Sequence, residues 1–354
     1  MNLNNLVELS GDASFRKFYR SGKSIIVFCK IEKKNNLLIY DAINKILIKN
    51  NIKAPKLIKE KRSADGTLKW LVQLEDGNII ETVYIPEPNR GTLCISSQAG
   101  CQLNCTFCAT AQQGFSRQLE TGEIIGQLWI ASHLLSERDR CDAAITNIVM
   151  MGMGEPLLNV PNVIPAIRLM LDNNGYNLSR KRVTVSTAGV IPGIDLLKEQ
   201  CLTSLAISLH APNNELRNKL VPLNKKYPLQ DLIRACQRYS TANNHSEVTF
   251  EYVMIKDLND QPKHAKDLLN LLSSVPAKVN LIPYNTVPGV PHQRSEESSI
   301  DRFREKLLRG GLVTTTRKTR GGDISAACGQ LAGSIKLRMN RSHKLLDQRI
   351  LNGK

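Results

Sequence analysis

The stretch RGTLCISSQAGCQLNCTFC (residues 90–108) decides the fold, because it joins a short β-rich run to a loop that carries three cysteines. From about residue 92 onward, further β-rich runs alternate with longer helical patterns, which is typical of a parallel sheet built from βα units. These runs are TNIVMMG (146–152), RVTVSTAG (182–189), TSLAISLHA (203–211), EVTFEYVMI (247–255), KVNLIPYN (278–285) and LVTTTRK (312–318).

The segments between the runs space their apolar residues by three and four, as amphipathic helices do. They are TGEIIGQLWIASHLLSE, NVIPAIRLMLDN, LQDLIRACQRYSTA, PKHAKDLLNLLSSV and SIDRFREKLLRG. Gly, Ser, His and Asn gather where the β-rich runs end, so we expect a site at the carboxyl ends of the strands. The pattern predicts an α/β fold, a barrel or half-barrel of βα units.

Cys101, Cys105 and Cys108 lie close together in one loop, so their thiolates are suited to hold three irons of a 4Fe-4S cluster. The fourth iron is then open to a substrate, which in radical chemistry is S-adenosylmethionine (SAM). The competing interpretations are a zinc site and a packed trio of cysteines. Structural zinc usually takes four protein ligands in paired Cys-x2-Cys knuckles, and the sequence has no second pair.

Composition indicates a globular protein with a polyanionic partner. The 354 residues carry a net charge of +16, which favours RNA or an acidic membrane surface. No stretch approaches a membrane span, and the first residues lack the features of a signal peptide, so we expect a cytoplasmic protein. In that compartment nine cysteines are ligands or reactive thiols rather than a disulfide framework, and the isolated ones (Cys29, Cys141, Cys201 and Cys236) are expected to be small buried hydrophobes.

The loop that begins at residue 90 resembles, together with several later motifs, the dual-specificity adenine-C2 methyltransferases of ribosomal and transfer RNA. The later motifs are NIVMMGMGEPLLN, RVTVSTAG, LAISLHAPN, NKKYP, VNLIPYN and RKTRGGDISAACGQLAG, and the likeness covers residues 60–333. It implies a partial (β/α)6 radical-SAM barrel with a small α+β N-terminal region. It further implies a cytoplasmic monomer that acts on 23S rRNA and on the tRNA anticodon loop with electrons from a flavodoxin or ferredoxin.

The resemblance also implies the residues that bind SAM. Gly154 and Glu155 follow a strand, where a carboxylate could grip the amino group of SAM, although Gly-Glu-Pro alone is more often only a turn. The other matching positions are Ser186, Ser208, Leu209, His210 and Asn285. Taken alone, His210 would be a packing histidine.

The same family uses a cysteine at the position of Cys328 to take a methyl group from one SAM, and a radical from a second SAM then joins the thiomethyl carbon to adenine. Cys94 matches the cysteine that releases this adduct by forming a disulfide with Cys328. Glu81 matches the residue that takes the proton from the adenine carbon. Without the resemblance, Cys328 would be inert, Cys94 a buried strand cysteine and Glu81 a solvent-facing hairpin residue.

Basic residues close to strand ends are candidates for contacts with RNA phosphates on the rim of the site, with a solvated basic face as the alternative. They are Arg180, Lys181, Arg182, Arg317, Lys318 and Arg320. An adenine inside folded RNA would also have to be flipped out of its stack into the pocket.

The N-terminal part departs from the family pattern. Residues 1–57 form an atypical segment that resembles the first part of an aminoglycoside-phosphotransferase-like kinase, but no kinase catalytic loop follows. We expect a boundary near residue 58, a β-hairpin connection over 58–86 that turns at Glu75-Asp76-Gly77, the core with the Cys328 loop over 87–333, and a basic tail over 334–354.

Two other functions compete with adenine-C2 methylation. The first is methylation of adenine C8 by the same cysteines, as in the antibiotic-resistance relatives. The segment TAQQGF after the cysteines and the extended RKTRGGDI stretch favour C2. The second is an iron-sulfur protein that binds RNA without turnover, which the joint presence of Cys94, Glu81 and Cys328 makes a poor fit.

Overall fold

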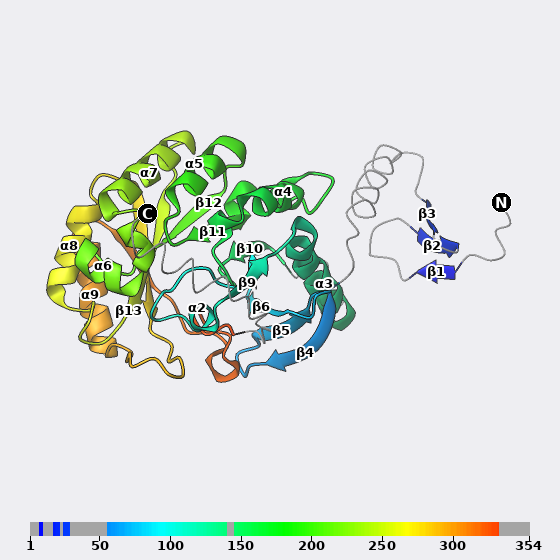
Figure 1. Ribbon diagram of the computed structural model, residues 1–354, viewed down its shortest axis with the longest axis horizontal. Coiled ribbons are helices and arrows are strands. Elements are labelled where there is room, and N and C mark those ends of the chain that lie inside the picture. The colour runs from blue at the N-terminus through cyan, green and yellow to red at the C-terminus, as the bar shows by residue number, and fades with distance from the viewer. Residues whose placement is uncertain (1–6, 10–16, 22–23, 29–54, 140–144, 333–354) are drawn as a thin grey trace, which may run out of the picture.

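A ten-stranded sheet organises the protein (Figure 1). The computed structural model describes residues 7–9, 17–21, 24–28, 55–139 and 145–332. The strands follow one another across the sheet in the order β15-β14-β13-β12-β11-β10-β7-β6-β5-β4.

The seven strands from β7 to β15 in this order are parallel, and they carry the βα units predicted from the sequence. Their bounds are β7 (Arg90–Cys94), β10 (Asn147–Met150), β11 (Val183–Thr187), β12 (Ser204–Ser208), β13 (Val248–Met254), β14 (Ala277–Pro283) and β15 (Val313–Thr316). Six of them are each followed by a helix, and no closed ring of strands forms among the described residues. The predicted α/β fold with a partial barrel is confirmed.

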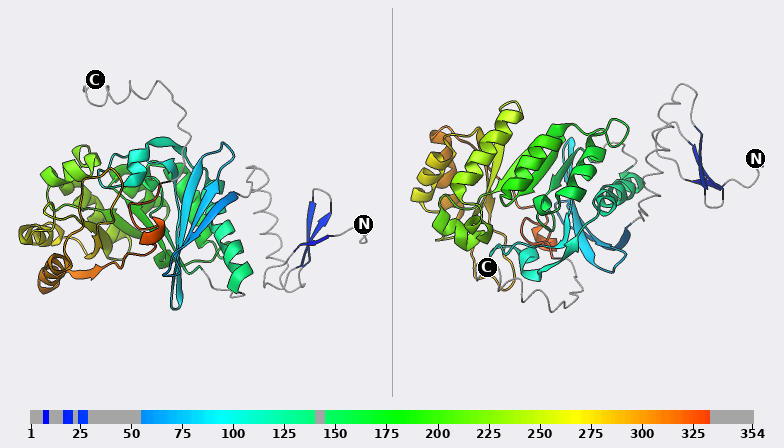
Figure 2. Two further views of the ribbon diagram at one scale, coloured as in Figure 1. Left: turned by 90° about the horizontal axis from the view of Figure 1, so that it is seen from below. Right: turned by 45° about the horizontal axis from the view of Figure 1, so that its top comes forward.

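The helices form a layer along the parallel strands (Figure 2). They are α3 (Thr121–Asp139), α4 (Val160–Leu171), α5 (Ile191–Gln200), α6 (Asn214–Leu220), α7 (Leu229–Ala242), α8 (Pro262–Leu272) and α9 (Glu297–Arg309). A parallel strand in the middle of such a sheet is shielded from water on both faces. Accordingly, every residue of β13 is buried. Cys201 and Cys236 are buried in this core, as expected of small hydrophobes.

Three antiparallel strands extend the sheet beyond β7: β6 (Ile79–Glu87), β5 (Leu68–Gln73) and β4 (Lys56–Arg62). The predicted hairpin is β5–β6, and Gly77 permits its turn with φ of +85°. The boundary expected near residue 58 falls within β4, because this strand pairs with β5 and so belongs to the main sheet. Helix α3 packs on these strands, where Gln127 accepts a hydrogen bond from Thr82 at 2.9 Å.

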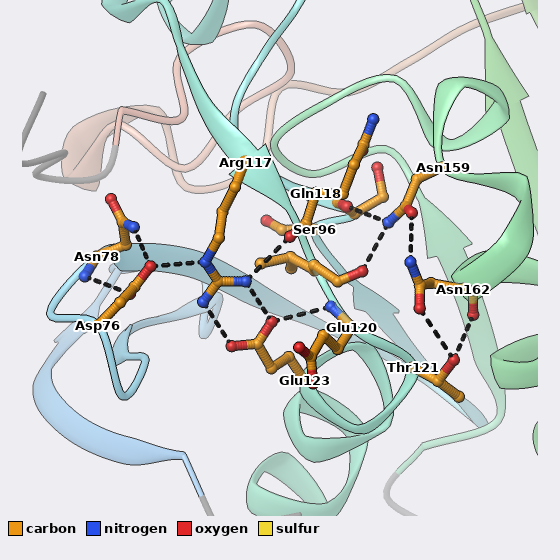
Figure 3. A network of polar contacts seen from close by, with 12 residues as sticks. Asp76, Asn78, Ser96, Arg117, Gln118, Glu120, Thr121, Glu123, Asn159 and Asn162 are labelled. Atoms are coloured by element: carbon orange, nitrogen blue, oxygen red, sulfur yellow. Dashed lines mark hydrogen bonds and ion pairs between the residues drawn. The ribbon is translucent and has the colours of Figure 1, made fainter. Parts of the chain in front are cut away.

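Arg117 ties the β5–β6 hairpin to the start of α3 (Figure 3). It lies in β9 (Phe115–Gln118), which pairs with β8 (Gln98–Gly100). The Arg117 guanidinium donates to Asp76 at 2.6 Å and to both carboxylate oxygens of Glu123 at 2.7 Å. Because Glu123 also accepts from the Glu120 N–H at 2.9 Å, the first turn of α3 is fixed to the hairpin through one arginine.

Residues 317–332 run from the end of β15 back to the antiparallel strands, shown in orange in Figure 1. The Ser63 hydroxyl donates to Asp323 at 2.6 Å, and the Gly321 N–H donates to Asp65 at 3.0 Å. Lys69 donates to the Ser325 carbonyl at 2.9 Å. This segment therefore links the two edges of the open barrel.

A separate antiparallel sheet lies near the N-terminus: β1 (Val7–Leu9), β2 (Lys17–Ser21) and β3 (Ser24–Phe28). The remainder of the atypical segment, Cys29, Cys141 and the predicted basic tail lie outside the described residues. Among the described helices, none has both the length and the apolar character needed to cross a membrane.

Candidate active site

A single cavity lies beyond the carboxyl ends of the parallel strands, and most of the predicted site residues line it. Those residues are Cys101, Cys105, Cys108, Gly154, Glu155, Ser186, Ser208, His210 and Cys328. Segments far apart in sequence meet here because they lie at or after the carboxyl ends of strands of the same parallel sheet. Leu209, Asn285, Cys94 and Glu81 do not belong to the lining.

The three cysteines of the loop are free thiols that face this cavity. Burial raises the pKa of Cys101 to about 12, and that of Cys105 well above its usual value. The neighbouring cysteines raise both pKa values further. Such thiols give up their protons when a cation takes them as ligands, so the set suits a metal group.

Three thiols line one cavity, a ligand set that suits a group with several metal atoms. In the described part of the chain, no three or more His, Cys, Asp or Glu side chains lie close enough together to hold a single metal ion. A cubane cluster instead offers each thiolate a different iron, so three separate thiols around one cavity are an appropriate ligand set.

Gly154 lets the chain after β10 pass close to β8. Its φ is +99°, and a Cβ there would lie 2.4 Å from Gln98 Cβ and 2.8 Å from the Gln98 backbone nitrogen. Gln98 in turn accepts a hydrogen bond from the Glu155 N–H at 2.9 Å. The glycine therefore fixes where the Glu155 backbone lies.

We expect Gly154→Ala to destabilise the apoprotein by about 2–5 kcal/mol, from left-handed strain plus the clash with Gln98. The matched control is Gly77→Ala, which has a similar φ of +85° but no atom within 4 Å of the new Cβ. It should cost only about 1–2 kcal/mol. Urea unfolding of the two variants measures the difference, and equal losses would show that the contact with Gln98 is unimportant.

The Glu155 carboxylate is buried at the wall of the cavity. It accepts hydrogen bonds from the Ala188 N–H at 2.7 Å and from the Leu157 N–H at 3.0 Å. Burial raises the pKa of Glu155 to about 7, although these bonds lower it. A buried carboxylate of this kind is stabilised by a cationic ligand, such as the ammonium group of an amino acid.

His210 enters the cavity from the loop after β12, and it has the left-handed φ of +60°. Its Nδ1 accepts a hydrogen bond from the Val253 N–H at 3.1 Å, and burial lowers its pKa to about 3. The ring is therefore neutral, with its proton on Nε2. Phe107 packs against it edge to face, with ring centroids 4.7 Å apart. His210 thus packs against Phe107 and also lines the cavity.

Arg217 in α6 is fully buried behind the strand ends. Its guanidinium donates to the carbonyls of Ala188 at 2.6 Å, Ser208 at 3.1 Å and Leu209 at 3.1 Å, and to the Asn224 side chain at 2.9 Å. Sequence reasoning missed this residue, because an arginine in the polar helix NELRNKL reads as a surface charge.

Cys328 is exposed in the segment after β15 and faces the same cavity as the three loop cysteines. Asn285 donates to the Cys328 carbonyl at 3.1 Å, so this predicted SAM-binding residue holds the Cys328 backbone. The neighbouring Gly329 carbonyl accepts from the Ala109 N–H at 2.8 Å, directly after the cysteine loop. Cys328 is therefore fixed to both walls of the cavity.

Cys94 ends β7 and is buried. Its pKa is raised to about 12 by burial and, to a lesser degree, by the charge of Cys328. Both residues are free thiols, so the disulfide predicted between them is absent from this structure. The pair is nonetheless close enough to interact electrostatically.

Glu81 is buried in β6 and is already paired. Its carboxylate forms an ion pair with Lys69 at 3.1 Å and accepts from the Ala332 N–H at 3.0 Å. It is therefore not the solvent-facing residue of an isolated hairpin, and it fixes the chain just after Cys328. Its action as a proton acceptor stays a prediction.

The structure corrects part of the predicted basic rim. Arg180, Lys181 and Arg182 form a short 3-10 turn (Arg180–Arg182) that precedes β11, so they lie at the edge of the parallel sheet opposite the cavity. Arg317, Lys318 and Arg320 follow β15 and lie at the correct edge. The sequence pattern placed basic residues near strands without distinguishing the starts of strands from their ends.

Arg317 lies in the cavity lining rather than on its rim. Its guanidinium is 3.7 Å from a carboxylate oxygen of Glu251, a buried cavity residue that sequence reasoning did not select. The charge of a Cys328 thiolate, and then that of Glu251, raise the pKa of Arg317 above its ordinary value. Arg317 is therefore a fixed cation beside Cys328 and Cys94.

Comparison with known proteins agrees with this geometry. Residues 95–269 match the family model of the radical SAM superfamily. The chain is 42% identical to a radical SAM methyltransferase from Sphaerobacter thermophilus, with a TM-score of 0.76 over 82% of this chain and 87% of that one.

A looser likeness extends to SuiB of Streptococcus suis bound to S-adenosylmethionine, at 14% identity and a TM-score of 0.46, over 66% of this chain and 52% of that one. Enzymes of the superfamily carry a 4Fe-4S cluster with SAM, which is the group that the three thiols and Glu155 suit. The chain therefore belongs to the radical SAM superfamily and, within it, to the radical SAM methyltransferases.

Proposed function

We propose that this enzyme methylates C2 of adenine in 23S rRNA and in the tRNA anticodon loop, and that Cys328 carries the methyl group. The observation that carries the proposal is the presence of Cys328 in the same cavity as Cys101, Cys105 and Cys108. The cleavage of SAM does not need a fourth thiol beside the cluster site. Cys328 is therefore available for a different step, the transfer of the methyl group. The choice of C2 rests on the motifs shared with the adenine-C2 methyltransferases.

When bound, the cluster and SAM supply a transferable methyl group and a 5'-deoxyadenosyl radical. Cys101, Cys105 and Cys108 would hold the cluster. Glu155 would hold the ammonium group of SAM, and Ser186, Ser208 and His210 line the space for the rest of the molecule.

Cys328 accepts the methyl group as a thiolate, after its thiol proton has passed to solvent. The new bond forms between Cys328 Sγ and the methyl carbon, and the old carbon-sulfur bond breaks with its electron pair left on the departing thioether. Arg317 lies close enough to Cys328 for a negative charge on this sulfur to raise the pKa of the guanidinium, so a fixed cation accompanies this step. The exposure of Cys328 allows the proton to leave.

Cys94 would release the RNA after the methyl carbon has joined adenine. Its thiolate attacks Cys328 Sγ, and the Cys94–Cys328 disulfide forms. The bond between Cys328 Sγ and the transferred carbon breaks with its electron pair moving onto that carbon, which takes up a proton to become the methyl group. An alkylated Cys328 has no negative charge, which removes one of the two causes that raise the pKa of Cys94. Alkylation of Cys328 therefore removes a charge that disfavours the Cys94 thiolate.

Lys318 and Arg320 follow β15 and the cavity residue Arg317 in sequence, and they could contact RNA phosphates from this edge of the sheet. A net charge of +16 supports a polyanionic substrate. An RNA substrate and free cysteines suit a cytoplasmic enzyme, which we propose to be a monomer. Single electrons would come from a flavodoxin or ferredoxin, and a further reductant would reduce the final disulfide.

The methylation state of Cys328 tests the proposal. Protein reconstituted anaerobically with cluster, SAM and reductant should show one added methyl group on the peptide that contains Cys328, by mass spectrometry after proteolysis. Cys201→Ala should show the same modification, because Cys201 lies in the core outside the cavity. An unmodified Cys328 under conditions in which SAM is cleaved would contradict the methyl-carrier role.

A further inference from the structure

Arg217 is a buried cation that forms no ion pair with a carboxylate of the described residues. The residue has no exposed surface, and its four hydrogen bonds go to three backbone carbonyls and one side-chain amide. Among residues 55–139 and 145–332, no carboxylate forms an ion pair with it. A buried charge with only neutral partners carries a large desolvation cost, which a nearby anion would offset.

The cysteine loop lies directly against the helix that carries Arg217. The Thr106 N–H donates to the Leu220 carbonyl at 3.1 Å, and Leu103, Cys105 and Phe107 pack against the cluster of apolar residues that includes Leu220. Arg217 is close enough to Cys105 for each to change the pKa of the other. The guanidinium is thus behind one of the three thiols that hold the iron-sulfur cluster.

Burial and charge act in opposite directions at Arg217. Burial lowers its pKa to about 10, and the negative charge of a Cys105 thiolate opposes that shift. Even at the lowered value the guanidinium remains protonated at neutral pH. The protein therefore holds a permanent positive charge in its interior, and the two thiols that would act on it when ionised are Cys105 and the core residue Cys236. Of these two, Cys105 is the one that faces the cavity.

We propose that Arg217 is the internal counter-ion of the 4Fe-4S cluster, that it makes the reduction potential of the cluster less negative, and that it couples the cluster to the SAM site. An added electron makes the cluster more anionic, so a fixed cation in a region of low dielectric constant stabilises the reduced form. The electron comes from the external reductant that the family requires. This inference depends on the cofactor and not on the RNA substrate.

The coupling follows from the carbonyls that Arg217 holds. Ala188, Ser208 and Leu209 lie at the ends of β11 and β12, and Ser208 and the following His210 line the cavity. The Ala188 N–H is at the same time the donor to Glu155. One side chain thus orders the strand ends that present the SAM-binding groups and also places its charge behind Cys105.

The sharpest variant adds a carboxylate without removing Arg217. Asn224→Asp replaces the amide that accepts from Arg217 at 2.9 Å with a group of the same shape and negative charge. The control is Asn213→Asp, which adds the same charge to the exposed N-cap of α6, where aspartate caps as well as asparagine. Two further variants separate the effect of the charge from that of the side-chain shape: Arg217→Lys keeps a positive charge, and Arg217→Met removes it.

The measurement is a redox titration of the reconstituted cluster followed by electron paramagnetic resonance, without RNA. At a fixed applied potential, Asn224→Asp should lower the ratio of reduced to oxidised cluster at least tenfold, which corresponds to about 59 mV for one electron. Asn213→Asp should stay within twofold of wild type. The ratio of Arg217→Lys should be closer to that of wild type than the ratio of Arg217→Met. The ratio of Arg217→Met should be lowered as much as that of Asn224→Asp.

Two results would overturn the proposal. The first is a fully loaded Asn224→Asp or Arg217→Met protein whose cluster has the wild-type potential. The second is equal failure of Arg217→Lys and Arg217→Met to assemble the cluster, which would show that the hydrogen-bond fork and not the charge is required. A protein with the expected potentials that does not methylate RNA would contradict the proposed function and leave this inference intact.

Discussion

Cys94→Ala should accumulate enzyme that is covalently joined to RNA. The adduct forms through Cys328, but the thiol that would release it is missing without Cys94. Cys328→Ala should form no adduct, because the atom that joins the RNA is missing. We expect the adduct to change from undetectable in Cys328→Ala to the main RNA-containing species in Cys94→Ala, on denaturing gels with labelled RNA.

The double variant Cys94→Ala/Cys328→Ala provides the control, and it should behave as Cys328→Ala alone. Cys236→Ala, a buried cysteine outside the cavity, should turn over without a persistent adduct. Identical behaviour of the two single variants would contradict the separate roles assigned to Cys94 and Cys328.

Cys105→Ala should abolish the iron-sulfur cluster, because two remaining thiolates cannot hold a cubane firmly. Iron and sulfide content after anaerobic reconstitution should fall to background, and SAM cleavage should be lost with it. Cys201→Ala is the control, since it removes a buried thiol from a part of the core that does not line the cavity. Full SAM cleavage by zinc-loaded protein, or by Cys105→Ala, would be incompatible with this site.

Much of the fold was predictable because its signals are local. The apolar runs over 247–255 and 278–285 became β13 and β14, since strands buried on both faces read as continuous apolar segments. Helix α5 was missed because Pro192 and Gly193 interrupt its first turn and reduce the helical pattern. Helix α6 was missed because it has only seven residues.

The candidate site was predictable only where a motif carried it. The cysteine triad, Glu155 and Cys328 came from such motifs, and the structure brings them to one cavity. The surroundings of Arg217 could not be predicted, because its partners are carbonyls of strands that meet only in the folded chain. Glu251 and the inward direction of Arg317 also depend on neighbouring strands.

The edge of the sheet on which a residue lies was the least predictable feature. Arg180, Lys181 and Arg182 adjoin a strand as closely in sequence as Arg317 does, yet they precede β11 whereas Arg317 follows β15. In a parallel sheet these positions are at opposite edges. Residues in similar sequence contexts therefore lie either at the edge that carries the cavity or at the edge far from it. Strand direction relative to each basic residue therefore has to be assigned before a rim is proposed.

Analysis of RNA nucleosides shows which adenine carbon the enzyme methylates. Reconstituted protein is incubated with SAM, reductant and either 23S rRNA fragments or tRNA, and the digested RNA is examined by liquid chromatography and mass spectrometry against 2-methyladenosine and 8-methyladenosine standards. Wild type should form 2-methyladenosine, and Cys328→Ala should form none. Formation of 8-methyladenosine, or of no methylated adenosine while SAM is cleaved and Cys328 is methylated, would contradict the proposed methylation of C2.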